Sequence, residues 1–148
     1  MDAEYWRQLF EYDDWANAGH LAALDGADAP GALRAMGHLL AAREIWLLRV
    51  KGESAAGLKF FRNLDVAACK ALHERVQRDW QAWLRTLTPE MLDAHVTFTD
   101  SLGNPYTLTR RVMLTHVLLH SAHHRGQSAM AGHTKTDFDL YLCPLVQA

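Results

Sequence analysis

Four histidines lie within nine residues of this 148-residue sequence, at positions 116, 120, 123 and 124. Histidine is the commonest protein ligand for metals and the side chain that exchanges a proton near neutral pH. In a helix, four residues turn the chain by about 400° and advance it by about 6 Å. His116, His120 and His124 therefore share one face, where two neighbours can reach a single ion. His123 is turned away from that face by about 100°.

A histidine pair on one helix needs a third ligand from elsewhere to form an open metal site. Catalytic zinc-like sites use three protein ligands and leave one position for water or substrate. In a helical bundle the third ligand comes from a facing helix. His38 is the best candidate, because it lies in an otherwise apolar stretch where an unpaired imidazole would cost about 1–3 kcal/mol. No glutamate follows His116 or His120, so the zinc-peptidase motif itself is absent.

Simpler interpretations of these residues stay open. A single buried histidine is more often a hydrogen-bonded core residue than a metal ligand, and the helical cluster could form a metal-free polar network. Arg43 and Glu44 are expected to form a solvated or inter-helix pair, and Arg125 a salt bridge. The remaining histidines are expected at the surface or at helix caps: His20, His73, His95 and His133.

Four stretches of helical periodicity must position the histidines. The sequence predicts helices over about 3–24, 30–51, 65–86 and 109–131. Asp2 and Asp65 are suited to cap two of them, and Pro30 to begin a third. Residues 94–107 alternate around a turn and predict a hairpin-like connection. The pattern indicates an all-α four-helix bundle in one domain over residues 1–148.

Composition and net charge indicate which classes of binding partner the protein is unsuited to. The chain is 49 % hydrophobic and 22 % charged, which is typical of globular proteins. A net charge of −2 and a pI of about 6.5 argue against binding to nucleic acid or to an anionic membrane. No apolar run approaches the ~18 residues of a membrane span, and the acidic N-terminus is unlike a signal peptide. Cys69 and Cys143 are far apart, which predicts reduced, buried thiols and a cytoplasmic location.

The sequence resembles the DinB/YfiT family of small bacterial helical bundles over about residues 5–142. The most specific part is the string H-V-x-x-H-x-x-x-H-R-G-Q over 116–127. Trp-Ala-Asn at 15–17, Gly-His-Leu at 37–39 and Asp-Leu-Tyr at 139–141 also fit the family pattern. The resemblance implies an up-down-down-up four-helix bundle that is often a homodimer.

The resemblance also implies a function. Family members hold a divalent metal ion with three histidines, which correspond here to His38, His120 and His124. His116 then lies beside the ligands as a pocket group. Members of known activity mostly transfer a low-molecular-weight thiol to an electrophile. The resemblance implies no activity on nucleic acid.

We therefore expect a metal-dependent enzyme that binds Zn²⁺ or Ni²⁺ and resembles a thiol S-transferase. A bound ion would lower the pKa of a cosubstrate thiol or, in the alternative of a metal-dependent hydrolase, of water. Tyr12, Asn17 and Arg125 are candidate pocket residues.

The rival hypothesis is a non-catalytic, metal-stabilised bundle, in which His116 or Asp13 would complete a closed coordination sphere. Aromatic seams on the first and third helices, such as that of Trp80 and Trp83, are interpreted as core or as a dimer interface.

Overall fold

The computed structural model describes residues 2–132, 134 and 136–147, and its elements follow the predicted order. Four long helices form an all-α bundle, and a hairpin precedes the last of them, as predicted. A short helix that was not predicted, α4, precedes the hairpin, because five residues span little more than one turn and show no periodicity. The elements are α1 (Ala3–Ala22), α2 (Pro30–Val50), α3 (Val66–Leu84), α4 (Pro89–Asp93), β1 (His95–Thr99), β2 (Pro105–Thr109), α5 (Arg110–Gly132), η1 (Leu140–Leu142) and η2 (Pro144–Val146).

The predicted helix starts are confirmed by their capping contacts. The Asp2 carboxylate accepts a hydrogen bond of 2.9 Å from the backbone N–H of Tyr5 at the start of α1. The Asp65 carboxylate accepts one of 2.7 Å from the N–H of Ala68 at the start of α3. Pro30 occupies the first turn of α2, where no intrahelical N–H donor is needed. These local signals place the helices before any tertiary contact is considered.

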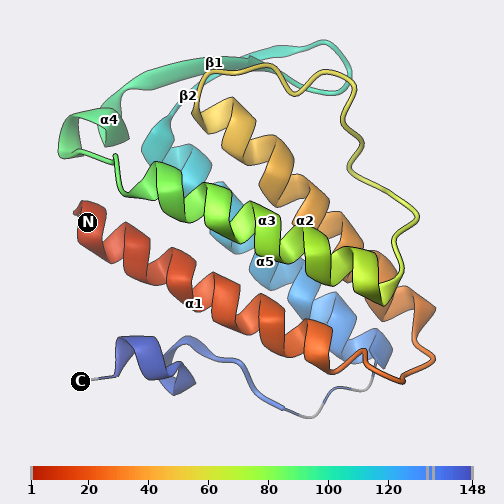
Figure 1. Ribbon diagram of the computed structural model, residues 1–148. Coiled ribbons are helices and arrows are strands. Elements are labelled where there is room, and N and C mark those ends of the chain that lie inside the picture. Colours follow the sequence, from red (N-terminus) through yellow and green to blue (C-terminus); the bar gives the residue numbers. More distant parts are fainter. Residues whose placement is uncertain (1, 133, 135, 148) are drawn as a thin grey trace.

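The helices run up, down, down and up through the bundle. Figure 1 shows α1 and α5 running in one direction and α2 and α3 in the other. Because α2 and α3 are parallel, residues 51–65 must return along the length of the bundle between them. Both α1 and α2 pack against α3 and α5, so α1 and α2 lie diagonally across the bundle from each other. This arrangement sets the α2 histidine directly against α5.

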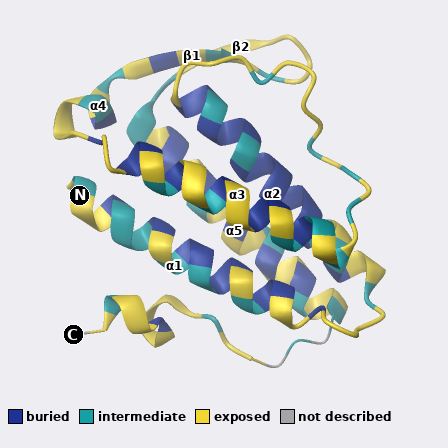
Figure 2. Cartoon of the chain, viewed as in Figure 1, coloured by how far each residue is buried: buried dark blue, intermediate teal, exposed yellow. Residues whose placement is uncertain are grey.

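The core is centred on α2, in which 14 of 21 residues are buried (Figure 2). Trp80 of α3 is fully buried, and its ring centroid lies 4.6 Å from that of Phe10 on α1 and 5.9 Å from that of Trp83. The Trp80 indole N–H donates a 3.0 Å hydrogen bond to the backbone carbonyl of Arg43. These aromatic residues of α1 and α3, which the sequence left as core or interface, therefore pack in the core.

The β1–β2 hairpin covers the C-terminal end of α2. Its strands are antiparallel, with His95 opposite Thr109 at the open end. Asp100 orders the turn by accepting hydrogen bonds from backbone N–H groups that follow it. The Phe98 ring lies 5.1 Å from that of Trp46 on α2, so the hairpin contributes to the wall beside the histidines.

The C-terminal segment runs back along α1 (Figure 1). The Phe138 ring lies 5.3 Å from the ring of Trp15 and 5.0 Å from that of His20. The Tyr12 hydroxyl donates a 2.8 Å hydrogen bond to the Phe138 carbonyl. The C-terminal segment thus docks on α1 through Phe138, and Tyr12 serves to hold it.

The close approach of the C-terminal segment to α1 depends on Gly19. A Cβ atom at this position would lie 2.1–2.7 Å from carbons of the Phe138 ring. We expect Gly19→Ala to displace Phe138 and to expose residues 136–147, measured by amide hydrogen exchange or limited proteolysis. The matched control is Gly126→Ala in α5, where a Cβ meets nothing within 4 Å and helix propensity should improve. Unchanged exchange in Gly19→Ala would contradict the observed packing.

The structure corrects the prediction for two of the other histidines. His20 and His73 are buried, with 7 % and 6 % of their surface exposed, rather than at the surface. Phe138 covers His20, and His73 faces the interior of the bundle. Burial lowers the pKa of each to about 4, so both are neutral at pH 7. His95 is exposed as predicted, whereas His133 lies outside the described residues.

Two further predictions concern the thiols and the membrane. Cys69 and Cys143 are both buried and unpaired, which confirms the prediction of free, buried thiols. Burial raises the pKa of the Cys69 thiol to about 11, so this thiol is unreactive at neutral pH. In the described part of the chain, no helix combines the length and the apolar character needed to cross a membrane.

Candidate metal centre

Three predicted ligands converge where α2 faces α5. The ring centroid of His38 lies 5.0 Å from that of His120 and 4.4 Å from that of His124, and the latter two are 4.4 Å apart. One nitrogen from each ring lies within 4.8 Å of the other two. The spacing of four residues on α5 and the direct packing of α2 against α5 therefore bring three imidazole donors together, as an ion of coordination radius about 2 Å requires.

Hydrogen bonds orient two of the three rings. His38 Nδ1 lies 3.1 Å from the backbone oxygen of Phe60, and His124 Nδ1 lies 2.6 Å from the side-chain oxygen of Gln127. Both oxygens are acceptors, so each Nδ1 carries the proton and donates it. The lone pair of each ring is then on Nε2. A ligand histidine held through its other nitrogen by a carbonyl-type oxygen is the usual arrangement at metal sites.

The electrostatics favour neutral imidazoles at the centre. Burial, followed by the charges of the adjacent His124 and His38, lowers the pKa of His120 to about 3. Burial also lowers the pKa of His38, opposed by its bond to the Phe60 carbonyl. Metal ligation requires the deprotonated ring, so these surroundings hold His38 and His120 in the form that binds an ion.

Neither candidate for a fourth ligand joins the three histidines. The His116 ring centroid is 5.5 Å from that of His120 and 4.5 Å from that of Trp46, and its nitrogens do not belong to the convergent group. Asp13 is held in ion pairs with Arg43 and Arg125. Over residues 2–132, 134 and 136–147, the convergent group thus consists of three protein donors.

Asn17 and Arg125 lie in the interior of the bundle. Both are buried, with 0 % and 4 % exposure. Arg125 Nη1 donates a 2.9 Å hydrogen bond to Asn17 Oδ1 and forms an ion pair with Asp13. The predicted salt bridge of Arg125 is thereby confirmed, and the part predicted for these two residues in a substrate pocket stays a prediction.

A buried ionic network joins Arg43 and Arg125 to two carboxylates of α1, and these carboxylate partners were not predicted. Arg43 of α2 is 1 % exposed, and its Nε lies 3.2 Å from Asp13 Oδ2 while its Nη1 lies 2.8 Å from Asp14 Oδ1. With Arg125, these residues connect α1, α2 and α5. Burial raises the pKa of Asp14 to about 6, although the charge of Arg43 opposes the rise. A charged residue within an apolar helical run, as at Arg43, is the sequence signal for such a network.

The predicted inter-helix pairing of Arg43 and Glu44 is confirmed, although each pairs with a different helix and not with the other. They point in different directions because adjacent helical residues are about 100° apart. Glu44 Oε1 lies 2.8 Å from Arg62 Nη2, and Glu44 also pairs with Arg75 of α3. Glu44 thus anchors the returning loop, and Arg43 belongs to the core.

The loop over residues 51–65 covers one side of the centre. The Phe61 ring stacks on that of His38, with centroids 4.2 Å apart and planes 9° apart. Phe61 is 56 % exposed, and the Arg34 guanidinium lies 5.2 Å from its ring. The loop therefore supplies both the carbonyl that orients His38 and the aromatic surface at the mouth of the centre. The sequence showed an unstructured loop here without indicating either contact.

The fold and the site together define a four-helix bundle with a three-histidine centre between its second and last long helices. A family model described as the DinB superfamily matches residues 33–128, a range that includes all three histidines, and the chain belongs to this superfamily. Comparison with curated proteins and with solved structures finds no significant match.

Proposed function

We propose that His38, His120 and His124 bind one divalent metal ion and that the protein uses it in a reaction on a small molecule. The observation that carries this proposal is the convergence of three imidazole nitrogens within 4.8 Å of one another. His38 and His124 are already oriented through Nδ1, and burial favours the neutral form of His38 and His120. The donor set therefore fits a metal ion of the kind that imidazole prefers, with Zn²⁺ and Ni²⁺ the leading candidates.

The residues around the centre would bind the ion and leave one of its coordination positions open. The Phe60 carbonyl and Gln127 side chain fix the tautomers of His38 and His124, and the bundle fixes the separation of α2 from α5. Three protein donors leave a position for an exogenous group, as in catalytic sites. When bound there, the ion supplies the acidity that lowers the pKa of a coordinated thiol or water.

For the reaction itself, we propose transfer of a low-molecular-weight thiol to an electrophile. Support comes from the family resemblance, with metal-dependent hydrolysis as the alternative. The count of three donors favours an enzyme over a non-catalytic bundle stabilised by metal, because structural zinc sites usually have four protein ligands.

Metal content tests the first part of this proposal. Protein without a histidine tag is expressed in medium containing Zn²⁺ and Ni²⁺, dialysed and analysed by mass spectrometry for metals. We expect about one divalent ion per chain, removable by a chelator and restored by the same ion. Protein that carries no metal, and that binds none when it is added, would overturn the proposal.

A reaction screen tests the second part. Glutathione, bacillithiol, mycothiol and cysteine are each combined with a panel of electrophiles, using metal-loaded and chelated protein. We expect thiol consumption that depends on metal. Hydrolysis of esters or amides by the loaded protein without any thiol would instead support the hydrolase. If no reaction occurs and the chelator only lowers thermal stability, the metal is structural.

Dimerisation stays a prediction. It was based on the family resemblance and on the aromatic seams of α1 and α3, of which Phe10, Trp80 and Trp83 are buried inside this bundle. Light scattering on the purified protein will give the oligomeric state directly.

A further inference from the structure

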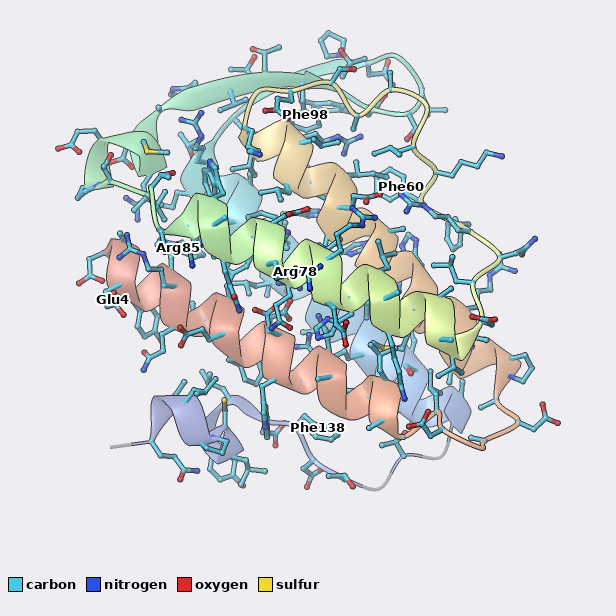
Figure 3. All side chains as sticks on the ribbon, in the orientation of Figure 1. Glu4, Phe60, Arg78, Arg85, Phe98 and Phe138 are labelled. Atoms are coloured by element: carbon cyan, nitrogen blue, oxygen red, sulfur yellow. The ribbon has the colours of Figure 1, made fainter. Side chains whose placement is uncertain are left out.

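Arg49 of α2 is a buried arginine enclosed by three aromatic rings. Only 6 % of its surface is exposed. Its guanidinium carbon lies 4.8 Å from the ring centroid of Trp46, 4.9 Å from that of Phe98 and 5.5 Å from that of Phe60. Figure 3 shows Phe60 and Phe98 beside the C-terminal half of α2, the first from the returning loop and the second from the hairpin. Three separate segments therefore position one cation.

The guanidinium of Arg49 has no polar partner within the described part of the chain. Its Nε is enclosed and makes no hydrogen bond, and no ion pair joins it to a carboxylate. The other buried arginines, Arg43 and Arg125, are both paired with Asp13. Ring faces attract the charge but leave the N–H donors in the guanidinium plane unused. Because an unpaired buried donor is unfavourable, a ligand that accepts these hydrogen bonds would complete the site.

Arg49 lines a cavity of about 580 Å³ between the hairpin and the loop. Phe60, Phe98 and Arg49 contribute to its walls, together with two acidic residues, Glu53 and Asp100. The Asp100 side chain is occupied by hydrogen bonds within its own turn. Its charge lies close enough to act on Arg49 without forming an ion pair. Two carboxylates on the walls would repel a multiply charged phosphate more than a singly charged carboxylate. The planar guanidinium also matches a carboxylate in shape.

Phe60 lines this cavity and also contacts His38 of the three-histidine centre. The Phe60 carbonyl accepts from His38 Nδ1, and the Phe60 ring lies 6.0 Å from the His38 ring on one side and 5.5 Å from the Arg49 guanidinium on the other. Trp46 makes a second connection, because its ring contacts Arg49 and lies 4.5 Å from that of His116. A molecule bound at Arg49 would therefore lie one aromatic side chain away from the centre.

We propose that Arg49 is the anion-binding residue of a subsite beside the three-histidine centre, and that it takes the carboxylate of a small organic acid. That this acid is the substrate rests on the metal-dependent reaction proposed above. That Arg49 binds a carboxylate rests only on its unpaired guanidinium and on the cavity.

Nuclear magnetic resonance on the full-length ¹⁵N-labelled protein tests the subsite. Sodium acetate is the probe, titrated at constant ionic strength against sodium chloride, with inorganic phosphate in a parallel series. We expect saturable shifts of the Arg49 Nε–H and the Trp46 indole N–H with acetate, and weaker binding of phosphate. Arg49→Gln should raise the Kd for acetate at least tenfold, in line with the strength of a charge-assisted pair. Arg49→Lys should bind more weakly than wild type, because it keeps the charge but loses the planar fork.

The matched control is Arg78→Gln, which removes an exposed arginine from α3 (Figure 3) and should leave the Kd for acetate unchanged. Equal shifts with chloride, or similar shifts at many arginines, would overturn the proposal, and tighter binding of phosphate would overturn its assignment to carboxylates. If Arg49→Gln does not fold, the acetate titration of the wild-type protein still shows whether the subsite binds a carboxylate.

Repeating this titration with chelated protein separates the subsite proposal from the proposal of a metal-dependent function. Acetate binding by a chain that never binds metal refutes only the metal-dependent function, and metal binding without acetate binding refutes only the subsite.

Discussion

Replacing Asp13 with alanine is expected to lower the free energy of unfolding by about 3–5 kcal/mol. Asp13 is fully buried and is the carboxylate shared by Arg43 and Arg125. Its removal leaves one guanidinium without any carboxylate, since Arg43 retains Asp14 but Arg125 retains only the Asn17 side chain. Unfolding in urea, followed by circular dichroism, measures the effect.

Two further variants distinguish the loss of the Asp13 charge from a general effect of substitutions in α1. Glu11→Ala alters an exposed acidic residue on the same helix and should change stability by no more than about 0.5 kcal/mol. Asp13→Asn keeps the shape and one acceptor, and it should fall between wild type and Asp13→Ala. A loss below about 1 kcal/mol for Asp13→Ala would mean that the network contributes no more than an exposed ion pair.

Replacing His120 with alanine is expected to reduce bound metal from about one ion per chain to a small fraction of that. His120 is central to the group, within 5.0 Å of both other rings by centroid distance, and its removal leaves two donors on different helices. The bound ion stabilises the folded chain by about 2.7 kcal/mol at a concentration one hundred times its Kd, and this gain should also disappear. Metal analysis and thermal unfolding with and without added Zn²⁺ measure the two effects.

The matched control is His123→Ala, because His123 is adjacent on α5 but lies outside the convergent group. It should retain both the metal and the stabilisation by Zn²⁺. Since His120 is only partly buried, the chelated His120→Ala protein should fold like chelated wild type. Full metal content in His120→Ala would refute the assignment of this ligand.

The sequence alone was sufficient for properties that depend on neighbours along the chain. Side-chain caps at Asp2 and Asp65, together with helical periodicity, placed the long helices to within a few residues. The step of four residues between His120 and His124 predicted their shared face, because helix geometry is local. His38 could be proposed as the third ligand because a polar residue in an apolar helical run needs a partner.

Only the tertiary structure decided which residues meet across the bundle. It placed His38 beside His120 and His124, supplied the Phe60 carbonyl that orients it, and buried His20 under Phe138. It also separated two buried arginines that look alike in sequence, since Arg43 has carboxylate partners and Arg49 has aromatic rings and a cavity. The physical reason is that periodicity tells which face of a helix is buried, whereas a side chain's partner depends on helix order, direction and loop path. Those are set by the packing of the whole chain.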